Sequence, residues 1–335
     1  MSKLPMGMPC RPVLMPLLAT ICPAAAVVLG CCAPSAKVTV DASNPRIGTD
    51  RASASVDAQT IVGRTTKTFS RARFYKPREP GLGGLEQALA PLVVDELPEG
   101  VAADAVDPFI AVVREIVYNE GYRTHLDPER PTVYAAWTMV EVGGTKLDQV
   151  VYLWWYAWRC ERCRGRHATG RGVRVVLWAD GFPVVWEALS GQPKQRVFFV
   201  SQSLERAAKE RFGDPLPGRR YSIERGLDAT PDVIVARVID DGPVPMGPYV
   251  YVGTRDEYAI TTVLCRCMPS QMESVEDTLY YDLEPIEALG GDWEPSSVRR
   301  CAIPREGRFG EDGLWHIVYP TAEESLDRIL RWPKI

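Results

Sequence analysis

The stretch Gln149-Val-Val-Tyr-Leu-Trp-Trp-Tyr-Ala-Trp158 carries no charge, and no other stretch after residue 30 is as apolar. Aromatic and β-branched residues favour extended backbone, and the run is too short to cross a bilayer as a helix. Alternate side chains of a strand point to opposite faces. One face would then carry Val150, Tyr152, Trp154, Tyr156 and Trp158, and the other Val151, Leu153, Trp155 and Ala157. The run therefore predicts a central strand that is covered on both faces, with Trp154, Trp155 and Trp158 buried.

The composition of the whole chain agrees with a large folded core. The 335 residues are 46% hydrophobic and include 9 Trp, which is enough to bury a sizeable interior. The formal net charge is -4, which gives no general attraction to the phosphates of nucleic acid. We therefore expect no nucleic-acid partner.

Strand-like segments surround the central run. The Gly143-Gly-Thr-Lys146 segment separates two extended runs, which is typical of a β-hairpin with a short glycine-bearing turn. The predicted strands are Val133–Val142, Leu147–Trp158, Arg174–Trp178, Phe182–Trp186, Val197–Val200, Val233–Ile239, Tyr249–Val252 and Ala259–Cys267.

Apolar residues at helical spacing predict helices before and after these strands. The predicted helices are Leu85–Leu97, Asp107–Asn119, a segment from Ser201 or Ser203 to Arg211, and Thr321–Arg331. Helices, then a run of strands, then a helix predict an α+β fold, with a mainly antiparallel β-meander sheet, N-terminal helices and a C-terminal helix. We expect residues 71–335 to form a single globular domain, or two subdomains with a break near 215–230.

The N-terminus has the features of an export signal. Lys3 and Arg11 supply a basic start, Val13–Leu29 is uncharged and mostly apolar, and Gly30-Cys31 follows. This segment resembles the signal peptides of bacterial lipoproteins, in which a small residue precedes the cysteine that is lipidated and becomes the new N-terminus. The resemblance covers residues 1–31 and implies a signal peptide over residues 1–30, a lipid on Cys31 and attachment to a membrane through that lipid. An ordinary secretory signal or an uncleaved anchor helix are the alternatives.

Residues 31–70 predict a flexible tether, because they are rich in Ser, Thr, Ala and Asp and have no sustained periodicity. A flexible chain of this length spans roughly 30–40 Å. Position 32 is Cys and not Asp, so the residue that retains some lipoproteins at the inner membrane is absent. This favours the outer membrane or cell surface over the inner membrane.

Two cysteine pairs follow predicted strands. Cys160 and Cys163 form a Cys-x-x-Cys sequence after the central run, and Cys265 and Cys267 lie at the end of another strand. If the two pairs lie close together, they can form disulfides between the segments or a tetrahedral zinc site. An exported protein favours disulfides. A redox-active pair and unlinked buried thiols are further alternatives, and we expect no other cofactor.

A cluster of arginines borders the first cysteine pair. It comprises Arg159, Arg162, Arg164, Arg166, Arg171 and Arg174, with His167 among them. A solvated loop is the ordinary interpretation of such a charge run. The functional alternative is an anion site, in which Arg159, Arg162, Arg164, Arg166 and His167 bind a phosphate, a carboxylate or an anionic sugar.

These features leave two hypotheses for function. The first is a non-enzymatic, lipid-anchored binding or structural module of the cell envelope, whose partner is an envelope protein or an anionic surface component. The second is a cell-surface hydrolase acting on an anionic or glycan substrate near the Arg159–Arg174 cluster. The chain contains no Gly-x-Ser-x-Gly, His-Glu-x-x-His or Walker sequence, so no motif decides whether it is an enzyme.

Overall fold

The computed structural model describes residues 71–78, 84–97, 100, 109–117, 121–127, 129–160, 165–189, 195–242, 244–245, 247–253, 259–265, 278–289 and 325–334. All of these lie within one compact unit, Asp50–Ile335. The predicted signal peptide 1–30, the predicted lipidation site Cys31 and the whole predicted tether 31–70 lie outside the described residues.

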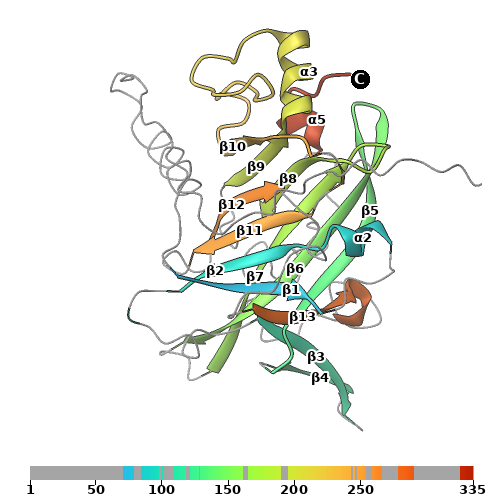
Figure 1. Ribbon diagram of the computed structural model, residues 1–335, viewed down its shortest axis with the longest axis vertical. Helices are drawn as coiled ribbons and strands as arrows, with labels where there is room; N and C mark the ends of the chain where they lie inside the picture. The colour runs from blue at the N-terminus through green and yellow to red at the C-terminus, as the bar shows by residue number, and fades with distance from the viewer. Residues whose placement is uncertain are drawn as a thin grey trace, which may run out of the picture. The chain divides into compact units, whose positions relative to one another are not determined.

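Strands make up most of the described chain (Figure 1). They are β1 (Ala72–Pro77), β2 (Leu92–Glu96), β3 (Phe109–Val117), β4 (Gly121–Asp127), β5 (Thr132–Val142), β6 (Thr145–Cys160), β7 (Gly165–Leu177), β8 (Pro183–Leu189), β9 (Arg196–Ser201), β10 (Val233–Ile239), β11 (Pro248–Gly253), β12 (Ala259–Cys265) and β13 (Thr278–Pro285). The helical segments that the structure describes are few and short. They are α2 (Leu85–Ala88), α3 (Gln202–Phe212), α5 (Leu326–Ile329) and the 3-10 helix η3 (Ile286–Leu289).

One sheet contains all of these strands. Its order is β10-β9-β8-β7-β6-β5-β13-β1-β2-β11-β12, and the β3–β4 hairpin joins through β3 to the end of β6. The last strand, β12, approaches β8 and β10, so the sheet curves until its two ends nearly meet. The apolar faces of strands that are distant in the sequence therefore enclose a common interior.

The expected α+β fold is wrong, because the described chain is mostly sheet. Strands β5 to β9 do follow one another as antiparallel neighbours. The rest of the sheet is not a meander, since β1–β13, β13–β5, β2–β11 and β9–β10 are parallel pairs.

Two predicted N-terminal helices are strands instead. The 85–97 segment is helical only over α2 and then forms β2, and the 107–119 segment contains β3. Both segments have apolar residues at helical spacing, but β2 contains Val93 and Val94, and β3 contains Ile110, Val112 and other β-branched residues. Such residues lose side-chain freedom in a helix and fit a sheet, and pairing with β1 and β4 supplies the hydrogen bonds that extended backbone needs.

The hairpin of β5 and β6 and the helix after β9 are confirmed. Val142 pairs with Thr145 around Gly143 and Gly144, whose φ angles of 59° and 85° suit a two-residue turn that only glycine adopts readily. Helix α3 begins after Ser201, whose Oγ accepts a hydrogen bond from the Leu204 amide at 3.2 Å. Of the C-terminal helix predicted over 321–331, the described part is α5, and residues 321–324 lie outside the described chain.

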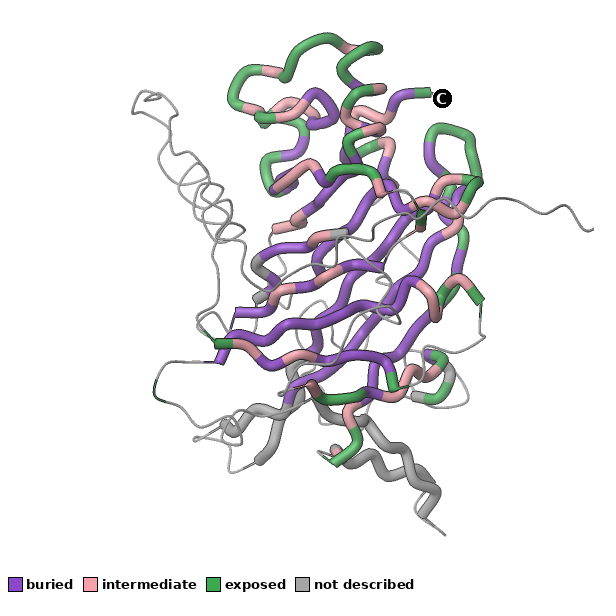
Figure 2. Tube along the Cα trace, viewed as in Figure 1, coloured by how far each residue is buried: buried purple, intermediate pink, exposed green. Residues whose placement is uncertain are grey.

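The strands of the sheet are mostly buried (Figure 2), and their apolar side chains form two clusters. The inner cluster contains Tyr75, Val93, Tyr152, Trp154, Tyr156, Trp186, Phe199, Val252 and Tyr281, among others. The outer cluster lies where α3 and α5 pack over β8, β9 and β10, and it includes Phe198, Val200, Leu204, Val235, Leu326 and Ile329. Among the helices that the structure describes, none has the length and apolar character needed to cross a membrane.

The described side chains of the central run, residues 149–156, are buried on both faces, as the alternation predicts. Trp154 lies on the inner face, and Trp155 on the outer face packs edge-on against Tyr134 with ring centroids 5.5 Å apart. Both tryptophans are fully buried. The side chain of Trp158 lies outside the described part of the chain.

Replacement of Trp155 by Ala should lower the free energy of unfolding by roughly 3–5 kcal/mol, because it removes a large buried side chain and leaves a cavity. Urea unfolding of the two proteins measures the difference. Met139→Ala is a suitable control, since Met139 lies on the neighbouring strand β5 and is 66% exposed. We expect this control to cost roughly 1 kcal/mol or less, and equal losses in the two variants would contradict the central position of β6.

Candidate functional site

Three tyrosine hydroxyls link the interior of the sheet to the segment formed by α2 and β2. Tyr152 on β6 donates a hydrogen bond to the carbonyl oxygen of Glu86. Tyr281 on β13 donates to the carbonyl oxygen of Pro91 at 2.6 Å, and Tyr156 on β6 donates to Oδ1 of Asp95 at 2.6 Å. In the sheet order β2 lies four strands away from β6, so the Tyr156–Asp95 bond crosses the interior and joins two walls.

Asp95 is placed in this interior by the alternation of β2. Val93 belongs to the inner cluster, and Asp95, two residues later, faces the same side. Asp95 pairs in register with Arg73 of β1 and with Val252 of β11. Its side chain is fully buried, and its Oδ2 atom has no hydrogen-bond partner among the described residues.

Burial changes the titration of these groups. It raises the pKa of Asp95 to about 7, although the hydrogen bond from Tyr156 and the charge of Arg73 oppose this rise. Burial also raises the pKa values of Tyr152, Tyr156 and Tyr281 well above the usual tyrosine value. The tyrosines therefore remain neutral donors, whereas Asp95 can take up or release a proton near neutral pH.

A second buried charged group lies on the outer face of the sheet. Glu187 on β8 accepts a hydrogen bond at Oε2 from Nη1 of Arg174 on β7. Arg196 at the start of β9 binds the same carboxylate with both ends of its guanidinium, at 2.8 Å from Nε to Oε1 and 3.0 Å from Nη2 to Oε2. Glu187 and Arg174 are buried, so this trio ties three adjacent strands together.

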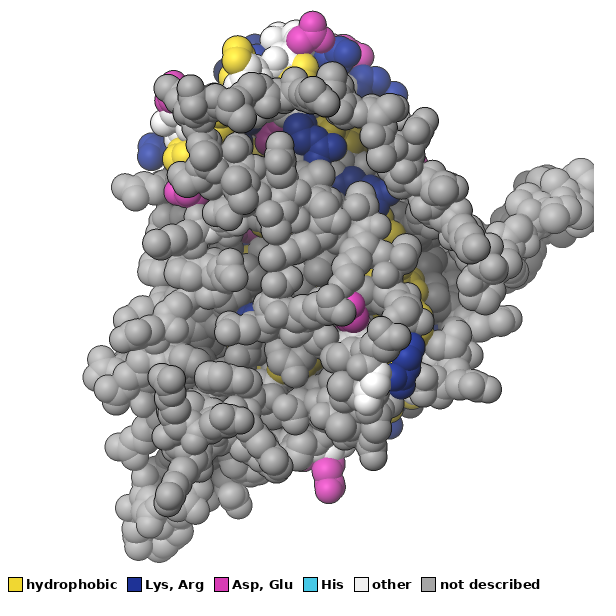
Figure 3. All heavy atoms as spheres, turned by 90° about the vertical axis from the view of Figure 1, so that its left-hand side faces the viewer, with side chains coloured by type: hydrophobic (Ala, Val, Ile, Leu, Met, Phe, Trp, Pro, Cys, Tyr) yellow, Lys and Arg dark blue, Asp and Glu magenta, His cyan; other side chains and the backbone are white. Residues whose placement is uncertain are grey.

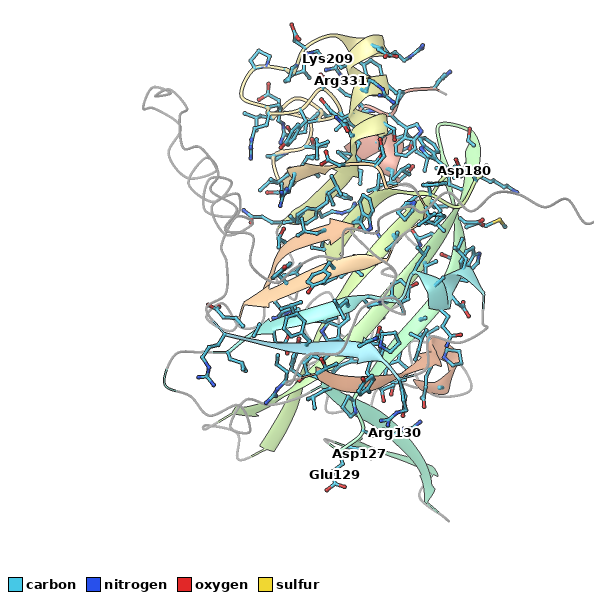
Figure 4. All side chains as sticks on the ribbon, viewed as in Figure 1. Asp127, Glu129, Arg130, Asp180, Lys209 and Arg331 are labelled. Atoms are coloured by element: carbon cyan, nitrogen blue, oxygen red, sulfur yellow. The ribbon has the colours of Figure 1, made fainter. Side chains whose placement is uncertain are left out.

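Ion pairs that are partly exposed connect β13 to the end of β1 and to the start of β5, away from the Glu187 trio. Asp282 on β13 accepts hydrogen bonds from Nε of Arg78 at 2.9 Å and from Nε of Arg130 at 3.1 Å. Burial alone would raise the pKa of Asp282, but the hydrogen bonds and charges of Arg130 and Arg78 lower it. Figure 4 shows Arg130 beside Glu129 and Asp127, where β4 leads into β5.

The described surface around α3 carries charges of both signs. Figure 3 shows lysine, arginine and acidic side chains mixed over the top of the molecule, where Figure 1 places α3. For example, Nζ of Lys209 lies 3.7 Å from Oδ1 of Asp214, and both side chains are exposed. Arg219 next to this surface binds the carbonyl oxygens of Arg225 and Val233 at 2.6 and 2.7 Å, so it holds the loop after α3 in place.

The predicted anion cluster lies at the β6–β7 hairpin. Arg159 pairs with Arg166 and Trp158 pairs with His167, but the side chains of these residues lie outside the described chain, as do Arg162 and Arg164 altogether. The two described arginines of the run face opposite sides of β7. Arg171 lies opposite Trp154 of the inner cluster, and Arg174 belongs to the outer trio. The anion site therefore stays a prediction for the first part of the run only.

The two predicted cysteine pairs end different strands. Cys160 is the last residue of β6 and Cys265 the last of β12, whereas Cys163 and Cys267 lie outside the described residues. The pairings make β6, β2 and β11 run in one direction and β12 in the other. Cys160 and Cys265 thus lie at opposite ends of the sheet, which does not favour the predicted clustering.

Within the described ranges, no group of three or more His, Cys, Asp or Glu residues is arranged to hold a metal ion. The side chains of Cys160 and Cys265 are not in those ranges. The disulfide and zinc interpretations of the cysteines therefore stay predictions.

Sequence reasoning did not identify Asp95 or its partner Tyr156 as a site. The segment around Asp95 was interpreted as a helix, in which Asp95 would not share a face with Val93. The useful signal was the Leu92-Val-Val-Asp-Glu96 sequence, because a strand assignment there would place one carboxylate on a buried face. The alternation of β6 already placed Tyr152 and Tyr156 on one face.

No protein-family model matches this chain, and neither do the curated proteins or the solved structures with which it was compared. The candidate site is therefore defined by its own geometry: a fully buried carboxylic acid that is fastened across the interior by a tyrosine and titrates near neutral pH.

Replacement of Asp95 by Asn should change how stability depends on pH. The pKa of Asp95 is 3.8 when unperturbed and about 7 in the folded protein, so the folded state holds the proton more tightly. The raised pKa stabilises the folded state, and this stabilisation is fully present below pH 4. It falls as the pH rises towards 7 and is constant above that, so the free energy of unfolding changes by about 4 kcal/mol in total. Asn keeps an acceptor for Tyr156 and cannot ionise. Urea unfolding at pH 5 and pH 8 measures the difference in free energy of unfolding between the variant and the parent. This difference should be more favourable to the variant at pH 8 than at pH 5, and the same difference at both pH values would contradict the assignment.

Replacement of Glu187 by Gln should destabilise the protein by roughly 3–5 kcal/mol, because it leaves the guanidinium groups of Arg174 and Arg196 without their buried counter-charge. Thermal or urea unfolding measures the effect. The control is Asp214→Asn, which removes a carboxylate from an exposed pair with Lys209, and exposed pairs contribute about 1 kcal/mol or less. A loss for Glu187→Gln as small as that of the control would show that the trio is not a structural tie.

Proposed function

We propose that the chain is an exported, lipid-anchored protein of the cell envelope, whose folded part is a binding or structural module. The observation that carries the proposal is Val28-Leu-Gly-Cys31 at the end of an uncharged apolar segment. Lys3 and Arg11 precede that segment, as expected of an export signal. Cys31 then carries the lipid, and the protein lies at the outer membrane or cell surface.

The position of the first strand supports a tethered arrangement. Strand β1 begins at Ala72, so about forty residues separate the lipid from the folded part. A flexible segment of this length reaches roughly 30–40 Å. The folded part can then contact a partner in the envelope while the lipid stays in the membrane.

The interior of the folded part supports a module and not an open catalytic cleft. Its aromatic side chains, including Tyr75, Trp154, Trp186 and Tyr281, are fully buried. The hydroxyls of Tyr152, Tyr156 and Tyr281 bind other groups of the protein, as Tyr156 binds Asp95. The hydrolase alternative depends on the Arg159–His167 part of the arginine run, whose side chains lie outside the described chain, and the described Arg171 and Arg174 face opposite sides of β7.

A small apolar surface is available for a partner. Trp137 and Met139 lie two residues apart on one face of β5 and are 39% and 66% exposed. Aromatic residues and methionine are enriched where proteins bind one another. An envelope protein is the partner that this chemistry favours, and an anionic surface component is the one that the arginine run favours.

Replacement of Cys31 by Ala tests the anchor. The variant should lose incorporation of labelled fatty acid completely and should leave the membrane fraction, because the thiol that accepts the lipid is absent. Cys32→Ala is the matched control, since it changes the neighbouring cysteine, and it should keep both properties. Labelling of the Cys31 variant at the level of the parent would overturn the proposal.

A further inference from the structure

The three tyrosine hydrogen bonds differ in whether their acceptor can titrate. Tyr152 and Tyr281 bind backbone carbonyl oxygens, which do not titrate. Tyr156 binds the side chain of Asp95, which does. The first part of the segment, from Glu86 to Pro91, is therefore held at every pH, and only the part around Asp95 is held by a group whose charge can change.

A charge on Asp95 would be poorly solvated in its present surroundings. The side chain is fully buried, Oδ2 has no partner among the described residues, and the hydroxyl of Tyr156 satisfies Oδ1 alone. A neutral carboxylic acid tolerates this environment far better than a carboxylate does. Ionisation thus favours any opening that brings water to Oδ2.

Other charged or titratable groups face the same interior and can influence the pKa of Asp95. From β1 these are Arg73, opposite Asp95, and Tyr75. From β6 they are Tyr152 and Tyr156, from β7 Arg171, and from β13 Tyr281. The described inner face of β11 next to Asp95 presents Val252, which does not titrate. Arg73 lowers the pKa of Asp95 but does not restore it to its ordinary value, since burial has the larger effect.

We propose that Asp95 and Tyr156 form a proton-operated latch, which holds β2 against β6 while Asp95 is protonated and releases the β1–β2 wall when Asp95 gives its proton to water. The bonds of Tyr152 and Tyr281 keep the α2 end of the segment in place during release. The opening is therefore local to the Asp95 end of β2 and to its partners in β1 and β11. The outer cluster under α3 lies on the other face of the sheet and stays packed.

The local character of the latch gives a defined pH profile. Asp95 has a pKa of about 7 in the closed state and an ordinary value once water reaches it. The opening equilibrium should then rise about tenfold per pH unit between pH 5 and 6.5 and become constant above pH 7.5. This profile does not depend on where the protein resides, so the test is separate from that of the lipid anchor.

Hydrogen exchange of the full-length protein from pH 5 to 8.5, corrected for the intrinsic exchange rates, measures the opening of each strand. We expect the opening equilibrium constant to rise with pH for the amides of β2 and to stay unchanged for the amides of α3. Asp95→Asn, which keeps an acceptor for Tyr156, should show no rise in β2. A flat profile in the parent, the same rise in α3, or a rise that persists in Asp95→Asn would overturn the proposal.

A direct titration keeps the test valid even if a variant fails to fold. The carbon resonance of the Asp95 carboxyl group in the parent protein, labelled at aspartate, should titrate near pH 7. Tyr156→Phe should raise that midpoint further, because the Tyr156 hydrogen bond lowers the pKa. A midpoint near the ordinary aspartate value in the parent would overturn the proposal.

Discussion

Strand β6 has large apolar side chains on both faces, and much of the fold serves to cover one face or the other. A flat sheet with helices on one side could not bury both Trp154 and Trp155. The sheet instead curves until β12 approaches β8 and β10, so that β1, β2 and β11 cover the inner face of β6. The inner cluster joins residues that are distant in sequence for this reason.

Buried polar groups in the interior of a nearly closed sheet are costly unless they find hydrogen-bond partners. The tyrosines of β6 and β13 meet this requirement by reaching across the interior with hydroxyl groups, because a tyrosine combines a large apolar ring with a polar end. Tyr152 and Tyr281 donate to the carbonyl oxygens of Glu86 in α2 and of Pro91, the residue before β2. The two bonds connect β6 and β13 to the segment in which α2 leads into β2.

Local sequence patterns predicted the parts of this structure that local forces determine. The Gly143-Gly144 hairpin needs only turn geometry, and α3 needs only Ser201 and a short apolar face, so both were predictable. Strands β2 and β3 were not, because their β-branched residues also recur at helical spacing and only the pairing with β1 and β4 decides between the two. The parallel pairs and the position of Asp95 depend on contacts between distant segments, for which a single sequence carries no local signal. The expected α+β fold was wrong because two strands were interpreted as helices at its start.

The buried carboxylates Glu187 and Asp95 are compensated in two different ways. Glu187 accepts hydrogen bonds from the guanidinium groups of Arg174 and Arg196, so two positive charges in direct contact compensate its charge. Asp95 has one hydroxyl and the more limited influence of Arg73, so a bound proton is its main compensation. An arginine paired with a carboxylate does not titrate near neutral pH, whereas a proton on a buried carboxylic acid does. The proton that Asp95 gains or loses near pH 7 therefore acts on the wall that contains β2, whereas Glu187 ties β7, β8 and β9 together through ion pairs.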